Sequence, residues 1–135
     1  MTKASSGRFI RFVLLSNGVV DLGAALSLFF PVLGLPMPGY GAYTPEIAFA
    51  TGGWGIAALT FGIGRIWASF KPELHPVMVV LGLIEGTILS LFCVGSVLFL
   101  DLSWLQVMLA LAVGSVFGLL YWIAWFMQRK QSPRS

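Results

Sequence analysis

Three ionisable residues stand inside long apolar runs of this sequence: Asp21, Arg65 and Glu85. Asn17 precedes Asp21 by four residues, so on a helix the two side chains lie on one face. A charged side chain at the centre of a bilayer costs about 2.5–3.5 kcal/mol on insertion scales, and such residues normally face protein or trapped water. Two carboxylates beside one guanidinium leave a negative charge uncompensated, which favours a shared proton. These four residues are the candidate binding or proton-sharing site.

A structural interpretation of the same residues is equally open. Asp21, Glu85 and Arg65 can form a polar tie that fixes helix packing. Alternatively, the long Arg65 side chain can extend to the membrane surface. His75 is expected in an interfacial loop, and it has no second and third ligand for a metal site. The sequence indicates no catalytic residue, no metal and no particular cofactor.

The composition identifies lipid as the main solvent of the chain. Of its 135 residues, 58% are hydrophobic and 10% are charged, and the mean hydropathy is +0.91. A soluble domain carries about 25% charged residues. The net charge is +3, but the basic residues lie between or beyond the apolar runs, so no nucleic-acid partner is expected. The first apolar run is long and lacks a small-residue cleavage motif, so we expect it to be retained.

Four segments are long enough for membrane spans, which need about 20 residues each. They cover residues 9–33, 47–70, 77–100 and 104–127, and Pro- and Gly-rich or very short breaks separate them. Pro45 and Pro76 suit the first turns of the second and third helices. The sequence therefore predicts an all-α integral membrane four-helix bundle that forms a single transmembrane domain over residues 1–135.

The positive charges and the aromatic residues predict how the helices sit in the membrane. The first and third loops contain no Lys or Arg, so the positive-inside rule places both termini and the second loop in the cytoplasm. Trp54 lies deep in its span and is expected to pack within the bundle. An interfacial belt is expected from the aromatic residues near span ends, namely Tyr40, Tyr43, Trp67, Trp104, Tyr121, Trp122 and Trp125.

Helix geometry predicts which polar groups meet. With a rise of about 1.5 Å per residue, Asp21 lies about 14 Å and Glu85 about 12 Å from the cytoplasmic boundary, at one level of the bundle. Arg65 continues a face of small residues on the second span, and small residues let helices approach closely. Further small pairs are Gly82 with Gly86 and Gly114 with Gly118. Hydroxyl groups within the spans are expected to bond to their own helix carbonyls, at Thr51, Thr60, Thr87 and Ser90.

Several short motifs resemble those of small bacterial four-helix membrane proteins of the DoxX-like group. The likeness lies in the basic start of the first helix (Arg8 and Arg11), the Asn17-Gly18 pair, the Gly-rich second span that ends at Arg65, and the acid of the third span, Glu85. The sequence departs from that group by having Asp21 where a Lys is common. The resemblance implies a four-helix fold in a bacterial inner membrane.

Three classes of function fit these features. The first is a non-enzymatic accessory subunit of a membrane complex, or a binder of a hydrophobic or amphipathic molecule at the intramembrane acidic site. The second is a proton-coupled small transporter or channel that uses Asp21 and Glu85. The third is a membrane enzyme in which these carboxylates form an acid/base pair on a lipid-like substrate. We favour a non-enzymatic role, with membrane lipids and other helices or self-association as the expected partners.

Overall fold

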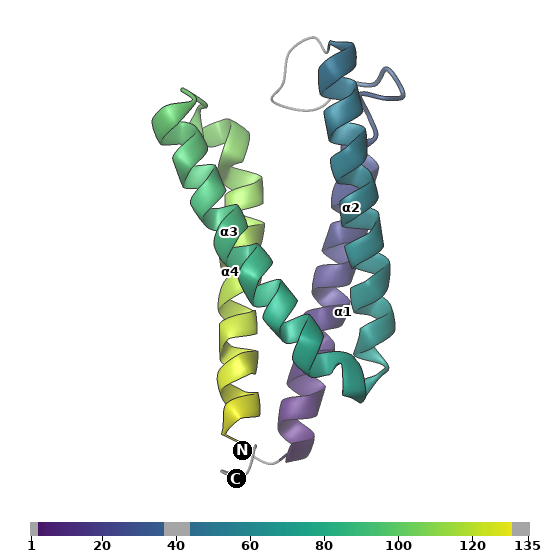
Figure 1. Cartoon of the computed structure of the whole chain (residues 1–135), viewed down its shortest axis with the longest axis vertical. Coiled ribbons are helices and arrows are strands. Elements are labelled where there is room, and N and C mark those ends of the chain that lie inside the picture. Colours follow the sequence, from purple (N-terminus) through teal and green to yellow (C-terminus); the bar gives the residue numbers. More distant parts are fainter. Residues whose placement is uncertain (1–2, 37–43, 131–135) are drawn as a thin grey trace. The chain divides into compact units, whose positions relative to one another are not determined.

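The computed structural model describes residues 3–36 and 44–130, which form four α-helices and one short 3-10 helix (Figure 1). The elements are α1 (Lys3–Leu28), α2 (Pro45–Ser69), η1 (Pro72–Leu74), α3 (His75–Phe99) and α4 (Trp104–Arg129). These described ranges contain no strand. Each α-helix is long and apolar enough to cross a membrane. The predicted all-α, four-helix membrane fold is confirmed, while the cytoplasmic placement of the termini stays a prediction.

The helix ends differ from the predicted spans mainly in α1, which was expected over 9–33 and runs from Lys3 to Leu28. Hydropathy marks the part of a helix that lies in lipid, and a helix can begin before it. The early end has a local cause, because residues 29–34 form turns and Gly34 takes a φ of +70°. Pro31 within these turns has no backbone N–H to continue a helical ladder. The predicted positions of Pro45 and Pro76 in first turns are confirmed.

Contacts divide the chain into two compact units. Unit 1 comprises Met1–Leu14 and Ala68–Ser135, and unit 2 comprises Leu15–Trp67. The boundaries fall inside α1 and α2, so each of these helices contributes to both units. The single domain expected over residues 1–135 stays a prediction.

In unit 1, α3 and α4 run side by side as an antiparallel hairpin (Figure 1). A methyl group added at Gly86 would lie 2.6 Å from the Cα atom of Gly118, so the two backbones are in direct contact there. Gly82 lies against the ring of Tyr121, which occupies the space that a side chain at this position would need. The hydroxyl oxygens of Ser90 and Ser115 add a hydrogen bond of 3.2 Å between the helices. The predicted role of the small pairs in close helix packing is confirmed for this hairpin.

The core of unit 1 is a cluster contributed by the start of α1, the end of α2, α3 and α4. Its buried members are Ile10, Val13, Leu14, Ala68, Val79, Tyr121 and Ala124. Tyr121 is completely buried, so its predicted place in an interfacial aromatic belt is wrong. The reason is the glycine opposite, because Gly82 leaves the space that the tyrosine ring fills. Tyr40 and Tyr43 lie outside the described residues.

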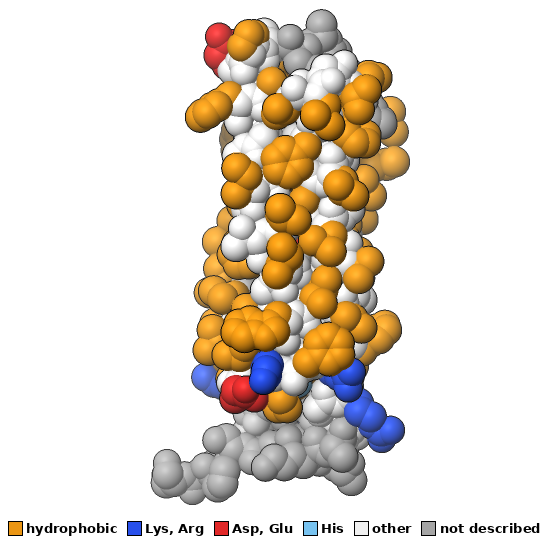
Figure 2. Space-filling model, turned by 90° about the vertical axis from the view of Figure 1, so that its right-hand side faces the viewer, with side chains coloured by type: hydrophobic (Ala, Val, Ile, Leu, Met, Phe, Trp, Pro, Cys, Tyr) orange, Lys and Arg blue, Asp and Glu red, His pale blue; other side chains and the backbone are white. Residues whose placement is uncertain are grey.

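The outer surface is apolar over most of its length. Figure 2 shows hydrophobic side chains along the visible face, with Lys and Arg side chains gathered near one end. Trp54 is 60% exposed, so the prediction that it packs within the bundle is wrong. Depth along a span does not reveal which face of a helix a residue occupies, because lipid and protein interior are both apolar. In the membrane, an exposed tryptophan meets acyl chains or another helix.

Candidate intramembrane ion-pair site

Two glycines bring α1 and α2 together in unit 2. A methyl group added at Gly18 would lie 2.8 Å from the carbonyl oxygen of Gly62, and one added at Gly62 would lie 3.0 Å from that of Gly18. Neither position has room for a side chain, so the backbones touch. Asp21 and Arg65 each follow one of these glycines by three residues, nearly one helical turn. The glycine contact therefore sets the distance across which the two charged side chains meet.

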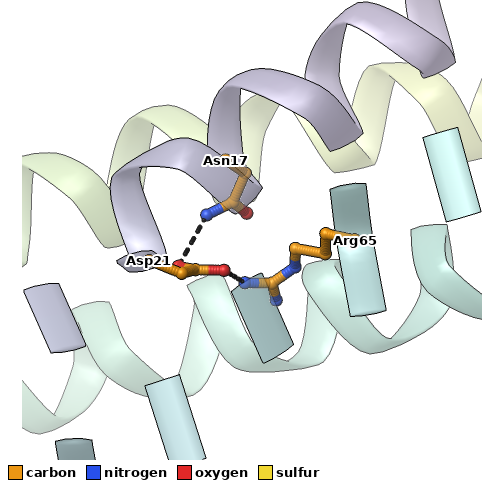
Figure 3. Close-up of polar contacts among 3 residues, drawn as sticks. All are labelled: Asn17, Asp21 and Arg65. Atoms are coloured by element: carbon orange, nitrogen blue, oxygen red, sulfur yellow. Dashed lines mark hydrogen bonds and ion pairs between the residues drawn. The ribbon is translucent and has the colours of Figure 1, made fainter. Parts of the chain in front are cut away.

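Asp21 and Arg65 form a salt bridge, in which Nη1 of Arg65 donates to Oδ2 of Asp21 (Figure 3). The other carboxylate oxygen, Oδ1, accepts a hydrogen bond of 3.0 Å from Nδ2 of Asn17. Both carboxylate oxygens thus have a donor. The guanidinium also lies over the ring of Phe61, with its central carbon 5.4 Å from the ring centroid. The predicted proximity of Asn17, Asp21 and Arg65 is observed.

The burial of the pair is unequal. The Arg65 side chain is 1% exposed and the Asp21 side chain is 13% exposed. A guanidinium this deeply buried points to its partner and does not extend to the membrane surface, which was the alternative interpretation. Removing one partner of a buried ion pair costs about 3–5 kcal/mol, because an uncompensated charge remains. The geometry therefore makes each of the two side chains necessary for the other.

Glu85 lies in unit 1, on α3, whereas the ion pair lies in unit 2. Its side chain is half-buried, and it directly precedes Gly86, where the backbones of α3 and α4 are in contact. The predicted meeting of Glu85 with Asp21 and Arg65 at a common level stays a prediction. So does proton sharing between the two acids.

His75 is placed differently from its prediction as an interfacial loop residue. It is the first residue of α3 and is 7% exposed, and its Nε2 atom has no hydrogen-bond partner within the described part of the chain. The signal for this position was Pro76, since proline favours the first turn of a helix and places its neighbour there too. Among residues 3–36 and 44–130, no group of His, Cys, Asp and Glu could hold a metal ion.

The hydroxyl groups of the spans bond to their own helices, as predicted. Thr60 donates to the carbonyl of Ile56 at 2.9 Å, and Thr87 donates to that of Leu83 at 2.7 Å. Thr51 and Ser90 make the same kind of bond. Each of these hydroxyl groups therefore bonds within its own helix, and Ser90 also bonds to Ser115 on the neighbouring helix.

Sequence reasoning missed two contributors to the ion-pair site. In the sequence Gly18 stands out only through the Asn17-Gly18 pair, whereas in the structure its contact with Gly62 is what allows the ion pair. Phe61 carried no signal beyond its position four residues before Arg65, a spacing that places both on one helix face. Because glycine and apolar residues are common in any span, neither residue can be assigned to the site until the pairing of α1 with α2 is known.

The fold and the site define a polytopic helical membrane protein with a buried ion pair between two of its spans. Comparison with known protein families, characterised proteins and solved structures gives no match to this chain. The resemblance to DoxX-like proteins therefore stays a prediction from the motifs.

Proposed function

We propose that the protein is a non-enzymatic accessory subunit of a larger complex in a bacterial inner membrane, with both termini in the cytoplasm. The observation that carries this proposal is that both carboxylate oxygens of Asp21 have a donor. Arg65 donates to one oxygen and Asn17 donates to the other. A carboxylate bonded in this way stabilises a helix pair. It is less suited to attack or deprotonate a substrate, which requires a group within reach of the reacting atom.

The exposed face of α2 supports association with further helices. Gly53 and Ala57 are exposed and four residues apart, and a methyl group added at Gly53 would meet no neighbouring atom within 4 Å. Trp54 next to them is exposed too. A pair of small residues at this spacing lets another helix approach closely, whereas large apolar residues suffice for contact with lipid. This surface is where we place the partner helix.

Purification in mild detergent followed by mass spectrometry tests the proposal. We expect recovery of the protein with stoichiometric amounts of a larger membrane complex. Gly53→Leu should reduce that recovery at least fivefold without changing the helix content, because the new side chain points into open space in the isolated chain. The matched control is Leu109→Ala, another exposed position, which should leave recovery unchanged. Recovery of a lone monomer or homodimer would refute the subunit proposal.

Proton-coupled transport is the second candidate, and the unequal burial of the ion pair favours it. Asp21 keeps 13% of its side chain exposed while Arg65 keeps 1%, and in this candidate function the exposed part of the carboxylate is where a proton would bind. In proteoliposomes, Asp21→Asn and Glu85→Gln should each abolish a proton-coupled flux. In the subunit proposal, the same variants lower complex yield and leave the turnover of the recovered complex intact. The two measurements separate the candidates.

A further inference from the structure

One end of unit 1 collects exposed basic side chains from three segments of the chain. Three segments pack together there: the start of α1, the residues that follow α2, and the end of α4. Phe9 and Ile10 of α1 lie in one cluster with Leu74 of η1 and Trp125 of α4. The exposed basic residues of these segments form what we call the basic belt: Arg8, Arg11, Lys71, Arg129 and Lys130. Figure 2 shows such side chains gathered beyond the apolar surface.

Two arginines of the basic belt are held against aromatic rings. The guanidinium carbon of Arg129 lies 3.9 Å from the centroid of the Trp125 ring. That of Arg11, on α1, lies 4.8 Å from the centroid of the Phe70 ring, which follows α2. A guanidinium stacked on a ring keeps its N–H donors directed outward in the plane, where they match the oxygens of a phosphate. The two arginines are therefore held near the rings by cation–π contacts, which a lysine without a ring neighbour lacks.

The rings under and beside these arginines form apolar support. Trp125 packs edge-on against Trp122 at 5.5 Å and against Phe126 at 5.0 Å between ring centroids. Phe70 and Phe126 are exposed, with about half of each surface open. Fixed cations thus stand next to exposed aromatic surface, which is the arrangement expected at a membrane interface.

The charge of this end is strongly one-signed. Within the described residues of 3–14, 68–76 and 121–130, Glu73 is the one acid against the five cations of the basic belt. We propose that the basic belt binds anionic phospholipids, with headgroup phosphates at Arg11 and Arg129 and acyl chains along Phe70 and Phe126. Apolar helices that adjoin the belt favour a lipid over a soluble polyanion. This inference does not depend on the subunit proposal, since a protein without partners can bind lipid in the same way.

Native mass spectrometry of the full chain, released from detergent micelles, tests the inference. The probes are dioleoylphosphatidylglycerol and dioleoylphosphatidylcholine at equal concentration, which have the same acyl chains. We expect at least a tenfold preference for phosphatidylglycerol. Removing two basic residues from an anionic interface weakens binding about thirtyfold, so Arg11→Gln/Arg129→Gln should abolish the preference. Equal binding of the two lipids to the unaltered protein would overturn the inference.

A matched pair of double variants separates binding at Arg11 and Arg129 from a general effect of positive charge. Lys71→Gln/Lys130→Gln removes the same charge but neither of the two guanidinium groups that lie over rings, and we expect it to lose less of the preference than Arg11→Gln/Arg129→Gln. Arg11→Lys/Arg129→Lys keeps the charge without the planar donors and should lose more than the glutamine variant of the lysines. Equal losses in both glutamine variants would overturn the assignment to Arg11 and Arg129. Unchanged circular dichroism verifies that each variant is folded.

Discussion

The contact between Gly86 and Gly118 gives the most direct test of how α3 and α4 are held together. Replacing Gly86 by Ala adds one methyl group at a place where the nearest atoms belong to backbone. The new carbon would lie 2.6 Å from Cα of Gly118, 2.7 Å from its nitrogen and 2.8 Å from the carbonyl oxygen of Gly114. No side-chain rotation relieves these contacts, so the helices themselves must separate.

The magnitude follows from that overlap. Carbon atoms pack best at about 3.5–4.0 Å, so the helices must move apart by about 1 Å at this point. Overpacking of this kind costs about 1–3 kcal/mol, and the better helix propensity of alanine returns up to about 1 kcal/mol. We therefore expect Gly86→Ala to lower the free energy of unfolding by about 1–2 kcal/mol. The ring of Tyr121 on Gly82, one turn away, would loosen with the same movement.

Reversible unfolding in mixed micelles, followed by circular dichroism during a titration with dodecyl sulfate, measures this change. The control is Gly95→Ala on the same helix, where the nearest atom to the new methyl group is a ring carbon of Phe99 at 3.9 Å. That variant should be unchanged or more stable by up to about 1 kcal/mol. Equal stability of the two variants would refute the claim that backbone contact at Gly86 holds the hairpin.

Three further predictions concern unit 2 and the helix hydroxyls. Gly18→Ala should destabilise the protein by about 1–3 kcal/mol, measured by the same titration, whereas Gly23→Ala should not, because no atom lies within 4 Å of the added group. A double-mutant cycle of Asp21→Asn and Arg65→Gln should give a coupling free energy of about 1–3 kcal/mol, and a value near zero would show that the salt bridge contributes nothing. Thr87→Val should change stability by less than about 0.5 kcal/mol, because its hydroxyl bonds only to its own helix; a larger loss would indicate an external partner.

The sequence was sufficient to predict the four helices because the features that indicate a helix are local. Breaks at Pro and Gly, span length and hydroxyl back-bonding depend on a few neighbouring residues, and these predictions are confirmed. The end of the first helix was misplaced because apolar residues continue through Pro31 into the turns that end at Gly34. Hydropathy does not distinguish an apolar turn from an apolar helix.

The site was only partly predictable because it depends on helix rotation and pairing. The spacing of Asn17 and Asp21 fixed one contact, and the small face that ends at Arg65 indicated the side on which α2 meets another helix. Trp54 and Tyr121 were assigned to the wrong environments, since an apolar residue is stable both in lipid and in the interior. The level of Glu85 relative to Asp21 rests on span geometry alone and stays a prediction.

The buried ion pair has a consequence for how the protein is made. Asp21 leaves the ribosome 44 residues before Arg65, so its charge reaches the membrane without its partner. Either charge alone opposes insertion by about 2.5–3.5 kcal/mol at a helix centre. We therefore expect the release of α1 into lipid to become favourable once α2 has followed it, so that the two segments enter the bilayer together as a hairpin.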